Sequence, residues 1–270
     1  MRRWMAAGLL VAMMVGCSAS DDPEPSNWAT MANRGPVPAE ATSTTTTEAG
    51  GTSTSTTSTS SSTTTLVEIP ENHWVQVATA LGDSLVTYRE PGGEPWWEFL
   101  APGPGDGPRV VRVLDDSDPD WLEVSLPVKP NGTTGWVARS SVELSTHAAR
   151  IEVDLSERTL QAWLNGELIA DASVAIGAVD SPTPTGTFFL IHKETLAEED
   201  PVFGHWILGT SGFSEVLPLI DGGVPAVAIH EAVDLSLLGQ AVSLGCLRVS
   251  PEVAEALFAL PLGALVVVSD

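Results

Sequence analysis

The segment that most constrains the fold is residues 42–65, because 20 of its 24 residues are Ser or Thr. A stretch without apolar side chains cannot bury enough surface to offset the entropy that is lost when the chain is ordered. We therefore predict that residues 18–69 form a disordered linker. The packed part of the chain must then follow this linker, and the apolar content of 43 % is enough to build packed cores.

The chain begins with the pattern of an export signal. Residues 1–3 are Met-Arg-Arg, and an apolar run follows from 4 to 15. About a dozen apolar residues are typical of a secretory signal and are too few to span a bilayer as a mature helix. Cys17 follows a small residue and resembles the end of a bacterial lipobox, although Met14 stands where Leu is usual.

The lipobox resemblance implies a signal peptide over residues 1–17, with lipid attached to Cys17. The protein is then expected on the outer face of the cytoplasmic membrane, within the cell wall. Ordinary cleavage with an unmodified Cys17 is the alternative. The formal net charge of −23 argues against nucleic acid or anionic lipid as the main partner, because both require a basic surface.

Residues 70–146 show short β-rich runs separated by Gly, Pro and Asp turns, which favours a small all-β barrel. The segment 121–137 resembles the last hairpin of bacterial SH3-like domains. We interpret Trp121 and Trp136 as residues that fill the core of this barrel. The alternative is that these aromatic side chains contact glycan or peptide.

Residues 149–270 form a second β-rich segment, so the predicted fold class is mainly β with one or two short helices. A tight turn at Asn165-Gly166 predicts a hairpin. Ser250 as N-cap and Pro251 at the first helical position predict a helix over 251–260. Strands are predicted at 150–155, 159–164, 167–170, 186–192, 224–230 and 265–268.

Cys246 and Cys17 are the two cysteines of the chain. They could form a disulfide, but Cys17 belongs to the targeting segment. Cys246 is then the free thiol of an exported protein, where thiols are vulnerable to oxidation, so a specific use of Cys246 is favoured. No Cys/His cluster has the spacing of a metal site, and His192 and His205 are isolated, with His205 a candidate for an active-site flap.

A cysteine nucleophile needs a nearby base and donors for an oxyanion. His230 ends an apolar strand, and Cys246 follows sixteen positions later. Gly245 permits a tight turn, so the backbone N–H groups of Gly245 and Cys246 are both expected to face the oxyanion. Arg248 shares a strand face with Cys246 and can grip a substrate carboxylate, with a structural ion pair as the alternative.

The order Ile229-His230, a loop, then Ser243-Leu244-Gly245-Cys246-Leu247-Arg248 resembles the signature of the YkuD-type L,D-transpeptidases. The resemblance covers residues 149–270. The other stretches that match this family are 151–156 with 160–166, 181–187, and 202–206 leading to 209–215.

The resemblance implies that Cys246 is the acylated nucleophile and His230 its base. Ser243, Leu244 and Gly245 would shape the oxyanion site, and Arg248 would support the motif or contact substrate. The implied substrate is a peptidoglycan tetrapeptide stem. D-Ala leaves, a thioester forms, and the side-chain amine of another stem resolves it to a 3→3 cross-link. We expect a monomer without cofactor or metal.

Two residues depart from the family pattern. Leu244 stands where many members have His, and Glu231 stands where Gly or Ser is common. We expect Glu231 to face solvent; if it points inward, it would raise the pKa of His230. Two other functions remain open: an L,D-carboxypeptidase, in which water resolves the thioester, and a wall-binding lipoprotein whose catalytic domain has lapsed.

Overall fold

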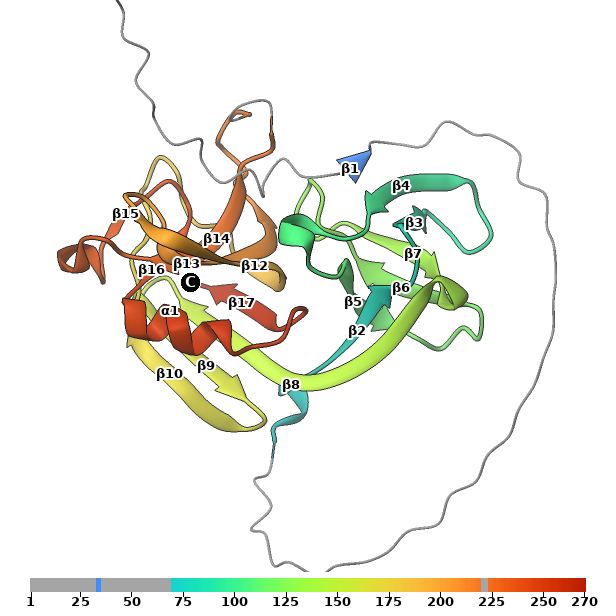
Figure 1. The fold of residues 1–270 in the computed structure, drawn as a ribbon, viewed down its shortest axis with the longest axis horizontal. Coiled ribbons are helices and arrows are strands. Elements are labelled where there is room, and N and C mark those ends of the chain that lie inside the picture. Colours follow the sequence, from blue (N-terminus) through green and yellow to red (C-terminus); the bar gives the residue numbers. More distant parts are fainter. Residues whose placement is uncertain (1–32, 35–68, 220–222) are drawn as a thin grey trace, which may run out of the picture.

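The computed structural model describes residues 33–34, 69–219 and 223–270, and for 33–34 the backbone alone (Figure 1). The predicted signal peptide, the lipidation of Cys17 and most of the predicted linker fall outside these residues. In the described part of the chain the mainly β fold class is confirmed, with a single α-helix.

The first half contains antiparallel strands and three short 3₁₀ turns. They are β1 (Asn33–Arg34), β2 (Trp74–Ala80), β3 (Ser84–Tyr88), β4 (Pro95–Leu100), β5 (Val110–Asp115), β6 (Trp121–Ser125) and β7 (Thr134–Ala138), with η2 (Glu71–His73), η3 (Pro104–Asp106) and η4 (Arg139–Ser141).

The second half contains both long and short strands, one 3₁₀ turn and the helix. They are β8 (Val142–Asp154), β9 (Thr159–Leu164), β10 (Glu167–Ser173), β11 (Ile176–Gly177), β12 (Gly186–Asp200), β13 (Gly204–Phe213), β14 (Ala226–Glu231), η5 (Leu235–Leu237), β15 (Ala241–Ser243), β16 (Leu247–Val249), α1 (Pro251–Phe258) and β17 (Leu265–Ser269).

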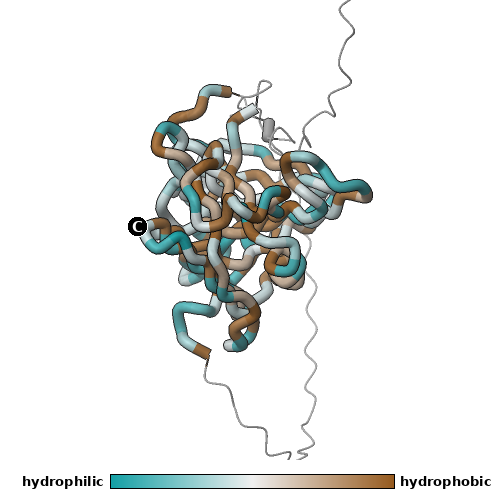
Figure 2. Tube along the Cα trace, turned by 90° about the vertical axis from the view of Figure 1, so that its left-hand side faces the viewer, coloured by the Kyte–Doolittle hydropathy of each residue, from teal (hydrophilic) through white to brown (hydrophobic). Residues whose placement is uncertain are grey.

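One 15-stranded sheet runs through both halves in the order β1-β4-β3-β7-β6-β5-β2-β8-β17-β12-β13-β14-β16, and β9 and β10 branch from β8. β8 joins the halves, because residues 142–148 pair with β2 and residues 149–154 pair with β9 (Figure 1). β11 and β15 form a separate parallel pair. Along the Cα trace, short apolar segments alternate with short polar segments (Figure 2). No helix in the described ranges has the length and apolar content needed to cross a membrane.

The first core does not contain the tryptophans that were predicted to fill it. Leu122 and Val137 are fully buried in this core. Successive side chains of a strand point to opposite faces, so Trp121 and Trp136 project from the other face and remain half-buried. The ring of Trp121 meets the ring of Tyr88 edge-on, 5.0 Å between centroids. The interpretation of Trp121 and Trp136 as core residues is therefore wrong.

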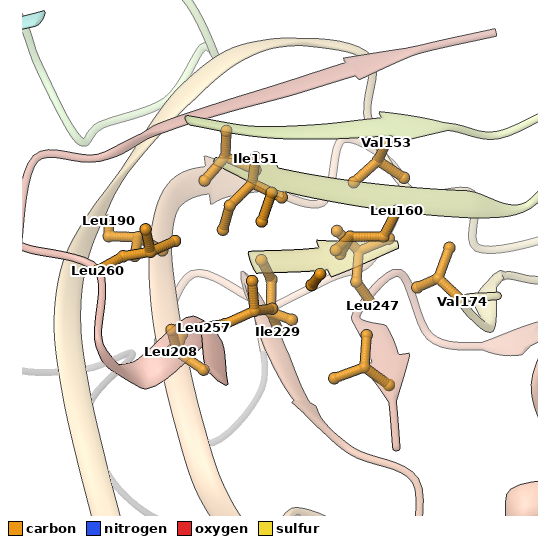
Figure 3. Close-up of a cluster of buried hydrophobic side chains, with 14 of the residues drawn as sticks. Ile151, Val153, Leu160, Val174, Leu190, Leu208, Ile229, Leu247, Leu257 and Leu260 are labelled. Carbon is orange, nitrogen blue, oxygen red and sulfur yellow. The ribbon is translucent and has the colours of Figure 1, made fainter. Parts of the chain in front are cut away.

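The second core lies between α1 and strands from β8 to β17 (Figure 3). Two local sequence predictions around this core are confirmed, the hairpin turn at residues 165–166 and the cap of α1. Asn165 and Gly166 both have positive φ, as a tight two-residue hairpin turn requires, and they join β9 to β10. Ser250 caps α1 by accepting a hydrogen bond from the backbone N–H of Val253. The helix ends at Phe258, two residues before the predicted limit.

Candidate active site

His230 and Cys246 lie on one face of two neighbouring parallel strands. Ile229 pairs with Leu247 and His230 with Arg248. Because Ile229 and Leu247 both point into the second core, their neighbours in sequence point to the opposite face. Cys246 directly precedes β16 and packs on this opposite face against Ile207 and Ala228.

The separation of the thiol and the imidazole follows from this register. The two residues are offset by two positions on adjacent strands, which corresponds to about 8 Å between Cα atoms for strands ~4.8 Å apart with a rise of ~3.3 Å per residue. An imidazole and a thiol that lean toward each other span this separation. Among the described residues, no hydrogen bond joins His230 directly to Cys246 in the resting structure.

The His230 ring is held in one tautomer. Its Nδ1 lies 2.8 Å from the backbone carbonyl oxygen of Glu231. A carbonyl oxygen can only accept, so Nδ1 carries the proton and Nε2 of the neutral ring carries a lone pair. Burial, followed by the charge of Arg248, lowers the pKa of His230 to about 4, although the Glu231 carbonyl and Asp200 oppose this. At neutral pH the ring is therefore a neutral base with Nε2 as its accepting atom.

Cys246 rests as a thiol. Burial raises the pKa of the half-buried Cys246 side chain, while a backbone hydrogen bond from Ala228 and the charge of Arg248 act in the opposite direction. With both groups neutral, the site does not store a thiolate–imidazolium pair. A thiol that attacks a carbonyl must lose its proton to a base, and the neutral imidazole of His230 lies on the same face of the sheet as Cys246.

Ser243 locks the loop that carries the thiol. Its hydroxyl donates to the carbonyl oxygen of Cys246 at 2.6 Å and accepts the N–H of Gly245 at 3.0 Å. Gly245 has φ of 116°, which disfavours any other residue. Because the Gly245 N–H is already bonded, the prediction that it faces an oxyanion together with Cys246 is wrong for Gly245. The N–H of Cys246 has no partner among the described residues and remains a candidate donor.

A second loop, which sequence reasoning left without a role, supports this one. The Ser181 hydroxyl donates to the carbonyl of Ser243 at 2.9 Å, and the Thr183 hydroxyl donates to the carbonyl of Gly245 at 3.0 Å. Thr183 also accepts the N–H of Gly177. A Cβ at Gly177 would overlap the backbone of residues 181–183. Ser181 and Thr183 form a cradle, the pair of hydroxyls that holds the carbonyls of residues 243 and 245. In the sequence, the signal for it is two hydroxyl residues two positions apart in a Pro-rich turn.

The two remaining motif residues are exposed to different degrees. Leu244, at the tip of the loop, is 65 % exposed. Arg248 is half-buried, and its Nε is buried without a hydrogen-bond partner among the described residues. No carboxylate in the described part of the chain pairs with Arg248, so the predicted alternative of a structural ion pair finds no support there.

The tip of the β12–β13 hairpin covers His230. The ring of Phe203 meets the His230 ring edge-on, with centroids 5.0 Å apart. Asp200 holds this tip, because its Oδ1 accepts the backbone N–H groups of Val202 and Phe203 at 2.7 and 2.9 Å. His205, predicted for a flap, lies just past the tip and contacts the Leu196 carbonyl through Nδ1.

Glu231 differs from its prediction. It is 3 % exposed rather than facing solvent, and its Oε2 accepts the backbone N–H of His205 at 2.9 Å. His192 lies away from the site, where its Nδ1 contacts the Pro104 carbonyl of the first half. No group of three His, Cys, Asp or Glu residues within the described ranges could hold a metal ion.

Comparison with protein families gives a match for the second half of the chain. Residues 148–268 match the YkuD family model, the L,D-transpeptidase catalytic domain. This match confirms, for that domain, the resemblance drawn from the motifs. No curated protein matches the chain.

Several solved structures are similar to the chain. An L,D-transpeptidase from Enterococcus faecium shares 20 % identity with a TM-score of 0.35, over 45 % of this chain and 49 % of that one. This chain thus spans about half of the Enterococcus protein. One from Mycobacterium smegmatis shares 17 % identity with a TM-score of 0.35, over 59 % and 99 %. L,D-transpeptidase 3 from Mycobacterium tuberculosis, bound to a faropenem-derived adduct, shares 18 % identity with a TM-score of 0.39, over 60 % and 91 %.

Proposed function

We propose that this protein is a peptidoglycan L,D-transpeptidase that forms 3→3 cross-links through a thioester on Cys246. The observation that carries the proposal is the neutral His230 ring, which presents Nε2 as acceptor on the sheet face that also holds the thiol. The family match of residues 148–268 supports the same class of reaction.

The first half-reaction acylates the cysteine. The Cys246 sulfur attacks the carbonyl carbon before the terminal D-Ala of a donor stem, and the thiol proton passes to Nε2 of His230. The carbonyl oxygen becomes an oxyanion, for which the free N–H of Cys246 is the candidate donor. When the oxyanion collapses, the bond to D-Ala breaks, the imidazolium gives its proton to the departing amine, and the thioester remains.

The second half-reaction transfers the acyl group. The side-chain amine of an acceptor stem attacks the thioester, and the neutral imidazole takes the proton that this amine loses. The sulfur then leaves as a thiolate and recovers that proton from His230, which returns both groups to their resting forms. Arg248 would hold a carboxylate of a stem peptide, and its Nε, which has no partner among the described residues, supports this role.

A product analysis tests the proposal. The purified full-length protein is incubated with disaccharide-tetrapeptide, and the products are followed by mass spectrometry. A dimer that lacks one D-Ala supports cross-linking. Tripeptide alone assigns the protein as an L,D-carboxypeptidase instead. Unchanged substrate, together with no carbapenem adduct, assigns it as a wall-binding lipoprotein.

Alanine variants of the two cysteines test which residue is the nucleophile. We expect the Cys246→Ala protein to fold and to form no carbapenem adduct by intact-mass measurement, because the attacking sulfur is gone. The Cys17→Ala protein is the matched control and should be acylated like the wild type. An adduct on Cys246→Ala would mean that another residue is the nucleophile.

The location of the protein is also a proposal. Export with lipid attached to Cys17 would place a monomeric enzyme beside its peptidoglycan substrate and anchor it to the bilayer. Labelled palmitate should be incorporated into the wild-type protein in cells and not into Cys17→Ala. Incorporation that persists in the variant would exclude this anchor.

A further inference from the structure

We propose that Glu231 is a positioning residue for His230: its carboxylate holds the tip of the β12–β13 hairpin over the base and thereby keeps water from the imidazole. The proposal deepens the proposed function, because it rests on His230 acting as the base. Its test includes a measurement that does not depend on activity.

The first observation is the environment of the carboxylate. Glu231 is 3 % exposed, and Oε2 accepts the backbone N–H of His205 at 2.9 Å. The other oxygen, Oε1, is buried without a hydrogen-bond partner among the described residues. Burial of a carboxylate that no cation neutralises is unfavourable. The hydrogen bond to His205 therefore ties this side chain to the hairpin, and no ion pair holds it among the described residues.

The second observation is how closely the hairpin approaches Glu231. Gly204 has φ of 68°, a conformation that favours glycine. A Cβ at Gly204 would overlap the Glu231 side chain. Backbone and carboxylate are therefore in direct contact at Gly204 and hydrogen-bonded at His205, so this end of the hairpin rests on Glu231.

The third observation is that the same tip reaches the base on the other face of β14. Glu231 and His230 are consecutive, so their side chains point to opposite faces of the strand. Gly204 and His205 contact Glu231, while Phe203 packs edge-on against His230 and belongs to the cluster that includes Cys246. The hairpin tip thus contacts both faces of β14. Its contacts with Glu231 on one face fix the position of Phe203 on the other.

The consequence is electrostatic. Two charged groups act on His230, Arg248 on β16 and Asp200 at the hairpin tip, and the Cys246 thiol lies on the same face of the sheet. On its own strand, the backbone carbonyl of Glu231 accepts a hydrogen bond from the ring. Burial is the largest influence and lowers the pKa of His230 to about 4. Release of the tip would hydrate the ring and let this pKa rise toward its ordinary value.

The test compares Glu231→Ala with Glu231→Gln by NMR titration of the His230 ring, assigned with a His230→Gln protein. The Gln amide oxygen can still accept the His205 N–H, whereas Ala cannot. We expect the pKa of His230 to rise by about one unit or more in Glu231→Ala, because water that reaches the ring stabilises its protonated form. In Glu231→Gln it should stay near the wild-type value.

Two further variants keep the test decisive if Glu231→Ala does not fold. Phe203→Ala removes the cover without touching Glu231, and it should raise the pKa of His230 in the same direction. His205→Ala is the matched control, because it keeps the backbone N–H that Glu231 binds, and it should leave the titration unchanged. In the same variants, the pH below which the rate of carbapenem acylation of Cys246 falls should become higher, because His230 is protonated at a higher pH.

An unchanged His230 titration in folded Glu231→Ala or in Phe203→Ala would overturn the inference. Equal shifts in Glu231→Gln and Glu231→Ala would also overturn it, because they would show that the charge and not the hydrogen bond matters. Failure of the proposed function has a different signature. The wild-type protein would then form no adduct at any pH, while the NMR titrations would still report on the role of Glu231.

Discussion

At the scale of single residues, the central feature of the candidate site is that the His230 ring is neutral. His230 is 1 % exposed, and the backbone carbonyl of Glu231 fixes the tautomer of its ring. A cysteine enzyme can store its reactivity as a thiolate–imidazolium pair or generate the thiolate during attack. The lowered pKa of His230 and the raised pKa of Cys246 both favour the second mode.

This neutrality makes stability depend on pH. The pKa of His230 is about 4 in the folded protein and ordinarily 6.5, so between these values the unfolded chain binds a proton that the folded chain does not. Stability should therefore fall by about 3 kcal/mol as pH drops from 6.5 to 4. Urea unfolding at pH 7 and pH 4.5 measures most of this loss.

The control for this prediction is His230→Gln, which lacks the titrating ring. Its stability should decrease less between pH 7 and pH 4.5 than that of the wild type, whatever its stability at pH 7. Equal decreases in the two proteins would show that His230 takes up its proton at the ordinary pH.

At the scale of elements, the loop of residues 243–246 is held by another loop more than sixty positions earlier in the chain. The hydroxyls of Ser181 and Thr183 donate to two carbonyls of this loop, and the parallel pair β11–β15 holds the two segments side by side. Gly177 makes this contact possible, because any side chain there would occupy the space of residues 181–183.

Replacement of Gly177 by Ala should displace the 181–183 loop and, through it, Cys246. We expect the rate of carbapenem acylation to fall on the order of 10²-fold, as displacements near 1 Å do at other active sites. Stopped-flow fluorescence or mass spectrometry measures the rate. Gly82→Ala is the matched control, since a Cβ there meets no atom closer than 3.9 Å, and its rate should equal that of the wild type.

At the scale of the whole molecule, the two halves are connected by more than the shared strand β8. The Asn131 side chain donates to the carbonyl of Phe213 at 2.8 Å and accepts the N–H of Phe213 at 3.0 Å. It therefore takes the place of a neighbouring strand at the end of β13. Phe213 also pairs with Ala226 at the start of β14, the strand that carries His230.

Asn131→Ala should leave both polar groups of Phe213 without these partners and lower the free energy of unfolding by about 1–3 kcal/mol. The acylation rate should fall as well, because the start of β14 loses its support. Thr133→Val is the matched control, since the Thr133 hydroxyl donates to the carbonyl of Pro130 within the same turn. Equal acylation rates in Asn131→Ala and Thr133→Val would show that the first half does not influence the site.

What the sequence determined by itself is local. The Asn165-Gly166 turn, the Ser250 cap and the order of His230 and Cys246 depend on neighbouring residues and on short periodic patterns. Such features follow from backbone preferences that act within a few positions, and the mainly β fold class follows from the same patterns.

The tertiary structure alone decided which face each side chain uses and which donors are already occupied. The burial of Glu231, the outward position of Trp136, the occupied N–H of Gly245 and the cradle of Ser181 and Thr183 each depend on sheet register or on a distant contact. A shift of one residue in register exchanges the two faces of a strand. Composition and spacing along a single segment therefore cannot specify these contacts, because they arise when segments far apart in the chain pack together.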